Sequence, residues 1–124
     1  MGSSPTRPTT CDPWFCPVDD RTQKIIDALA ACAASCAACS EDCASRGDSR
    51  FAACIALCND CAVLCGARIP LIASGSQFSA ELCRVCADAC EQCADECDRR
   101  GMTACADACR KAAQVCREMA GAAA

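Results

Sequence analysis

The chain has 124 residues, enough for one small domain, and carries 18 cysteines but no histidine and no tyrosine. A net charge of −4 argues against a nucleic-acid partner, which needs a basic face, and without a run of 18 apolar residues we expect no transmembrane helix. Without histidine no Ser-His-Asp triad can form, and no paired carboxylates stand in an evident pocket, so we expect no enzyme.

Residues 1–20 are polar and hold four prolines, Pro5, Pro8, Pro13 and Pro17, which predicts an irregular N-terminal arm. The arm has no apolar stretch of the kind found in a secretory signal. We therefore expect a cytoplasmic protein, in which thiols stay reduced.

The first two helices are predicted from caps and breaks. Asp20 followed by Gln23 resembles a capping box and opens a helix that runs to about Ser45. Residues 46–48 form a break, and Asp48 or Ser49 can cap a second helix that ends around 66–69, before Pro70. A loop over 69–76 then follows.

The second half repeats this arrangement. Ser76 or Ser79 starts a third helix that runs to about Arg99, and Thr103 can cap a fourth helix that fades near Met119. Short connections make neighbouring helices antiparallel. The prediction is an all-α, up-down-up-down four-helix bundle over residues 21–119, with a C-terminal tail over 120–124.

The cysteines repeat along these helices. The spacing C-x3-C-x2-C-x3-C occurs at 32–43, 54–65 and 86–97, and a degenerate copy at 105–116 has Ala112 in place of its third cysteine. At about 100° per residue, each set forms one narrow stripe on its helix, where a bundle normally carries Leu, Ile or Val. The predicted metal ligands in the stripes are Cys32, Cys36, Cys39, Cys43, Cys54, Cys58, Cys61, Cys65, Cys83, Cys86, Cys90, Cys93, Cys97, Cys105, Cys109 and Cys116.

Other uses of these cysteines fit less well. Within a stripe the Cβ atoms are about 5–6 Å apart, too far for disulfides, although disulfides between helices remain open. Zinc sites and iron–sulfur clusters usually place their cysteines on turns or loops, although a bundle could assemble some four-thiolate zinc sites. A redox enzyme is least favoured, because C-x-x-C here lacks a βαβ setting.

Cu(I) is the best match for a continuous thiol stripe. It is a soft ion that takes thiolate ligands and accepts low coordination numbers. If each thiolate bridges two ions, the capacity approaches about one Cu(I) per cysteine, and the charges balance. The function predicted is storage of multiple Cu(I) ions, with general buffering of zinc or cadmium as the alternative.

The repeated cysteine runs resemble those of the bacterial copper storage proteins, over about residues 20–119. The resemblance implies a four-helix bundle whose inward cysteines bind many Cu(I) ions, and a homotetramer of the cytosolic branch. Two features depart from the family: cytosolic relatives often place histidine near the bundle mouth, which this chain cannot do, and Ala112 interrupts the fourth stripe.

The sequence also predicts different roles for the two ends of the bundle. Met102 and Met119 border the fourth stripe at opposite ends, where a thioether can relay Cu(I) or simply fill a gap. The end with Arg46, Arg99 and Met102 is the predicted mouth. The other end is the predicted apolar plug, formed by Ile25, Leu29, Ile69, Leu71, Ile72 and Phe78.

Three features lie outside the stripes. Cys11 and Cys16, in the arm near the plug, could bind extra copper, cap a site or form a disulfide. The second helix is apolar all round, and Val63 points away from its stripe. We therefore expect the first and second helices to form a subunit interface, with the third and fourth more solvated.

Overall fold

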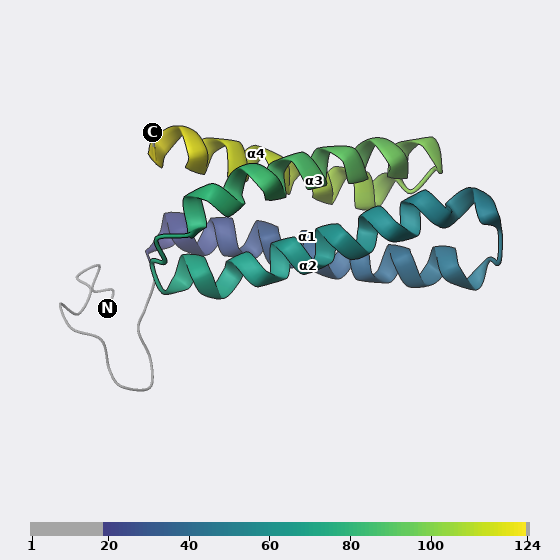
Figure 1. Ribbon diagram of the computed structural model, residues 1–124, viewed down its shortest axis with the longest axis horizontal. Coiled ribbons are helices and arrows are strands. Elements are labelled where there is room, and N and C mark those ends of the chain that lie inside the picture. Colours follow the sequence, from purple (N-terminus) through teal and green to yellow (C-terminus); the bar gives the residue numbers. More distant parts are fainter. Residues whose placement is uncertain (1–18, 124) are drawn as a thin grey trace.

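The computed structural model describes residues 19–123. In this range the chain forms four long helices, which confirms the all-α prediction (Figure 1). They are α1 (Asp20–Ser45), α2 (Ala52–Ala73), α3 (Ser79–Arg99) and α4 (Thr103–Ala123), and a short 3-10 turn, η1 (Ser49–Phe51), precedes α2. Cys11 and Cys16 lie outside the described residues, so the predictions made for them stay predictions.

The helices pair as two antiparallel hairpins, α1 with α2 and α3 with α4, and α2·α3 and α1·α4 contacts close the bundle. In Figure 1 the turns of both hairpins lie at one end, which we call the hairpin end. The α2–α3 connection, the start of α1 and the end of α4 lie at the other, which we call the connection end. The up-down-up-down topology is as predicted.

Caps and glycines set the helix boundaries near their predicted places. The N-cap of α1 is Asp19, one residue before the predicted start, and its carboxylate accepts a hydrogen bond from the Thr22 amide at 2.7 Å. Asp48 caps η1 by accepting from the Arg50 amide at 2.9 Å. Gly47 and Gly101, with φ of 64° and 76°, supply the left-handed conformation that ends α1 and α3.

The end of α2 differs from its prediction. The helix continues through Pro70 to Ala73, and the connection to α3 is only residues 74–78. Pro70 removes one backbone hydrogen bond, but Ile69 and Ile72 on either side of it pack against the core and offset that loss. The glycine that ends the helix is Gly75, with φ of 69°, after which the Ser76 amide bonds to the Leu71 carbonyl at 2.8 Å.

The end of α4 also differs, because the helix continues to Ala123 instead of fading near Met119. The last residues are mostly alanine, the best helix former, so they extend the helix without needing contacts.

The outer face of α2 is as apolar as predicted, with Val63 69 % exposed. By length and composition alone, Ser49–Ala73 is also long and apolar enough to cross a membrane, with a mean hydropathy of 1.6. The prediction of no transmembrane helix missed this segment because it required an unbroken run of 18 apolar residues. Only 22 % of the 18-residue window with this hydropathy is buried in the bundle, namely the inward stripe of thiols, so most of the apolar surface of α2 faces outward.

Candidate metal centre

The core of the bundle is made of sulfur. All 16 cysteines on the four helices are buried, and none of them forms a disulfide with another described residue. The inward thiol stripes are therefore confirmed as a structural feature. Ala112, in the place of the missing cysteine, is also fully buried.

Facing helices bring the thiols closer together than the stripes do. Along one helix the Sγ atoms of Cys32 and Cys36 are 4.0 Å apart. Across the bundle, the distance falls to 3.4 Å between Cys36 and Cys109 and to 3.5 Å between Cys32 and Cys61. Cys32 and Cys36 therefore each have thiol neighbours on more than one helix, an arrangement from which the bundle can assemble a four-thiolate site.

These contacts form five compact groups, in each of which all sulfur atoms lie within 4.8 Å of one another. From the connection end toward the hairpin end they are Cys32–Cys61–Cys65–Cys90, Cys32–Cys36–Cys61–Cys109, Cys36–Cys93–Cys105–Cys109, Cys39–Cys58–Cys97–Cys105 and Cys39–Cys43–Cys54. Each group shares at least one cysteine with the next. The groups therefore make one continuous series along the bundle axis.

The overlap limits what separate metal sites could do. With metal–sulfur bonds of about 2.3 Å, a tetrahedral zinc site has sulfur atoms roughly 3.8 Å apart, so single groups suit zinc in size. However, no more than three of the five groups can be filled without sharing a ligand. Filling all of them requires thiolates that bridge two ions, which favours a soft monovalent metal.

The thiols of this network differ strongly in acidity. Hydrogen bonding with Cys109, followed by that with Cys36, lowers the pKa of Cys32 to about 2. Burial, with the nearby Cys58 sulfur, raises the pKa of Cys54 to about 12. Metal binding must displace the protons of these thiols, because the thiolate is the ligand.

The hairpin end is where the sulfur core comes nearest to solvent. Cys39 and Cys105 are 8 % and 4 % exposed, whereas most of the other cysteines are fully buried. Beside them lies a surface hollow of about 490 Å³ lined by Ser35, Cys39, Met102, Cys105 and their neighbours. Met102 packs against the core here, so the predicted mouth coincides with a hollow that reaches two thiols.

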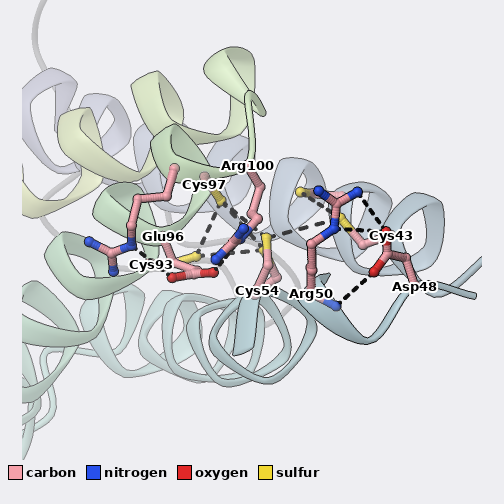
Figure 2. A network of polar contacts seen from close by, with 11 residues as sticks. Cys43, Asp48, Arg50, Cys54, Cys93, Glu96, Cys97 and Arg100 are labelled. Atoms are coloured by element: carbon pink, nitrogen blue, oxygen red, sulfur yellow. Dashed lines mark hydrogen bonds and ion pairs between the residues drawn. The ribbon is translucent and has the colours of Figure 1, made fainter. Parts of the chain in front are cut away.

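A second polar network lies at the same end (Figure 2). Glu96 is buried and accepts hydrogen bonds from Arg100 Nε at 2.9 Å and Arg99 Nε at 3.0 Å. The pKa of Glu96 is lowered, first by the Arg100 hydrogen bond. Its neighbour in the chain, Cys97, lies 3.9 Å from Cys54. The paired charges thus fix the last turn of α3 beside the thiols.

The connection end contains a buried cation that the sequence interpretation missed. Arg68 is 0 % exposed, where we expected only an apolar plug. Ile25 and Leu29 are buried as expected, but Phe78 is 58 % exposed and forms no part of the plug. A signal was present: positions 54, 58, 61, 65 and 68 step by four and three, so Arg68 occupies the next place in the cysteine stripe of α2.

Three cysteines near Arg68, namely Cys83, Cys86 and Cys116, belong to none of the five groups. They are buried as predicted, but their role as ligands stays a prediction. Met119, the second predicted relay residue, accepts a hydrogen bond from Arg68 Nη2 at 3.4 Å. This contact ties Met119 to the connection end of the core, where it also lines a surface hollow of about 650 Å³ with Ile25 and Val115.

Fold and site together define a helical bundle with a thiol-lined core, and comparison with known proteins places it in a family. The sequence model of the Csp family, described as copper storage protein, matches residues 18–121. The chain belongs to the copper storage protein family. A search of curated proteins finds no match.

Several solved structures are similar to this chain. The Nmul_A1745 protein of Nitrosospira multiformis is 32 % identical, with a TM-score of 0.77 over 85 % of this chain and 99 % of that one. A Cu(I)-bound copper storage protein, BsCsp3, is 33 % identical, with a TM-score of 0.74 over 82 % and 99 %. The metal-free copper storage protein 3 of Bacillus subtilis is 35 % identical, with a TM-score of 0.71 over 80 % and 98 %.

Proposed function

We propose that this protein stores many Cu(I) ions through the thiolates of its bundle core. The observation that carries the proposal is the continuous series of five overlapping cysteine groups. Because neighbouring groups share ligands, complete filling calls for bridging thiolates, and Cu(I) is the soft ion that suits them. The similarity to a Cu(I)-bound copper storage protein supports the same metal.

The proposed ligands are, first of all, the thirteen cysteines of the five groups. The expected capacity is on the order of one Cu(I) per cysteine of the core. Storage needs no catalytic group, so we propose a binding protein and not an enzyme. Reduced thiols are required throughout, which supports a reducing compartment such as the cytoplasm.

Copper is proposed to pass through the hollow at the hairpin end. The thioether of Met102 offers a soft ligand at its edge, followed by Cys39 and Cys105 at the start of the sulfur core. This route needs no histidine.

The protein is proposed to form a homo-oligomer, a tetramer by resemblance to its family, through the outer face of α2. Val63 is exposed there, and with Leu57, Leu64 and the exposed Val85 of α3 it lines a surface hollow of about 530 Å³. A second copy would remove this apolar surface from water. The interface thus includes part of α3, where we expected it to use α1 and α2.

Anaerobic titration of the reduced protein with Cu(I), in competition with a chelator of known affinity, tests the storage function. We expect a capacity on the order of one ion per cysteine of the core. The alternative of zinc or cadmium buffering rests on the compact thiol groups, of which no more than three can be filled without sharing a ligand: two groups of four thiols and the three-thiol group Cys39–Cys43–Cys54. Saturation near three zinc ions, with a similar number of Cu(I) ions, would favour that alternative.

A further inference from the structure

The cation at the connection end lacks the partners that a buried arginine normally has. Arg68 Nη1 donates to Cys116 Sγ at 2.8 Å and Nη2 donates to Met119 Sδ at 3.4 Å. Its Nε atom has no hydrogen-bond partner among the described residues. No carboxylate in the described part of the chain forms an ion pair with it either, although Arg99, Arg100, Arg110 and Arg117 all have one. The electrostatic partners of Arg68 are therefore sulfur atoms.

Sulfur atoms occupy the place beside Arg68 that a carboxylate would normally take. Burial acts to lower the pKa of Arg68, but the charges of Cys116 and Cys83 and a hydrogen bond with Cys86 outweigh it and raise the pKa. An arginine keeps its charge in proteins in any case. A permanent positive charge thus lies among the three cysteines that belong to none of the five groups.

Cys86 continues the sulfur core beyond the nearest group, and Cys83 and Cys116 lie close to each other beside it. Cys86 lies 3.6 Å from Cys65, which belongs to the nearest group. Cys83 donates to the Cys116 carbonyl at 2.6 Å, which holds that thiol next to α4. The series of compact groups therefore ends beside the Arg68 guanidinium, although buried thiols are present beyond that point.

We propose that the Arg68 guanidinium takes the place of one Cu(I) ion at the connection end of the core and so limits the copper capacity there. The proposal rests on the proposed storage function. A core with one Cu(I) per thiolate is neutral, so a fixed positive charge beside Cys83, Cys86 and Cys116 reduces by about one the ions needed for balance. The same charge repels Cu(I) from this end, which favours uptake at the hairpin end.

The test compares three variants of the full-length protein. Arg68→Leu and Arg68→Gln remove the charge without adding a soft ligand, whereas Arg68→Lys keeps it. Anaerobic Cu(I) titration should give about one more ion per chain for the Leu and Gln variants than for wild type, and the wild-type number for Lys. Circular dichroism of each metal-free variant establishes that the helices are formed.

Unchanged capacity in the two uncharged variants would overturn the proposal while leaving storage intact. A wild type that binds only one or two Cu(I) ions would instead overturn storage itself.

A crystallographic measurement on copper-loaded wild type avoids dependence on the variants. The electron density should show Arg68 in place, and anomalous scattering should show no copper between its guanidinium and Cys116. An Arg68 side chain displaced by a copper bound to Cys83, Cys86 and Cys116 would overturn the proposal. In the Arg68→Leu protein, an additional copper peak at these sulfurs is expected.

Discussion

The Sγ atoms of Cys32 and Cys61 lie 3.5 Å apart, although the two residues are 29 positions apart and stand on antiparallel helices. Both sulfurs belong to the same two thiol groups, and each group adds two further cysteines from opposite sides. A thiol pair that serves two sites must bridge when both are filled. The contribution of a cysteine to copper capacity should therefore depend on how many groups it joins.

Cys36→Ala should lower the copper capacity by about two ions, because Cys36 belongs to two groups, whereas Cys83→Ala should lower it by one at most. Alanine is the best helix former, so both variants should keep their helices. Anaerobic titration with Cu(I) measures the difference. Equal losses in the two variants would show that position in the series does not matter.

The reduced, metal-free protein should already be helical, because caps such as Asp19 and the alanine-rich helices do not need metal. Copper should then raise the melting temperature strongly, because only the folded chain presents aligned thiols, and the shift should grow with the copper added. Circular dichroism against temperature tests both points. A random-coil spectrum without metal would contradict the preformed bundle.

Met102→Leu should slow copper uptake several-fold without changing the final capacity, because it removes the soft ligand beside Cys39 and Cys105 but keeps the apolar packing. Stopped-flow absorbance of Cu(I)–thiolate formation measures the rate. Met119→Leu is the matched control, since Met119 lies beside the positive charge of Arg68 at the connection end, and its uptake rate should equal that of wild type. If Met119→Leu were the slower variant, copper would be using the other end.

The fold was predictable because its signals are local. The spacing of the cysteines, together with glycines such as Gly47 and Gly101, placed the four helices and their inward faces to within a few residues. The error at Pro70 arose because a proline normally ends a helix, while the packing of Ile69 and Ile72 that carries α2 past it is a tertiary effect. The same holds for Phe78, whose exposure depends on how α2 and α3 are joined.

The site was predictable only in part. Helical periodicity shows which thiols face inward, but it cannot show that Cys83, Cys86 and Cys116 stand apart from the other thirteen. That distinction depends on how far the four helices are shifted relative to one another along the bundle axis. Arg68 was missed because a charged residue is normally placed on the surface, although its position in the cysteine stripe was visible in the sequence.

Asp48→Asn should destabilise the metal-free protein at neutral pH by a few degrees in melting temperature, because the charge that pairs with Arg50 is lost while asparagine can still cap η1. The Arg50 side-chain hydrogen bond lowers the pKa of Asp48. A lowered pKa means that the carboxylate stabilises the fold above its ordinary pKa and that this contribution disappears as the pH falls through the lowered value. Melting curves of both proteins should therefore converge in acid, and a gap that stays constant with pH would contradict the assignment.

Val63→Asp should dissociate the oligomer while leaving the copper capacity per chain unchanged. Val63 is 69 % exposed and lines the hollow between α2 and α3, whose rim already carries the carboxylates of Asp60 and Asp88. A further carboxylate would be buried beside like charges in an assembled protein but solvated in a free one. Its position on the face of α2 opposite the thiols separates assembly from metal binding.

Light scattering of wild type and variant, with Cu(I) titration of both, measures the two effects. Glu81→Asp is a matched control, since it changes a residue of α3 outside that hollow without altering charge. We expect an oligomer for wild type and the control, and a monomer or smaller assembly for Val63→Asp. A monomeric wild type would rule out the interface. In that case flotation of wild type with lipid vesicles would show whether the apolar face of α2 contacts a membrane instead.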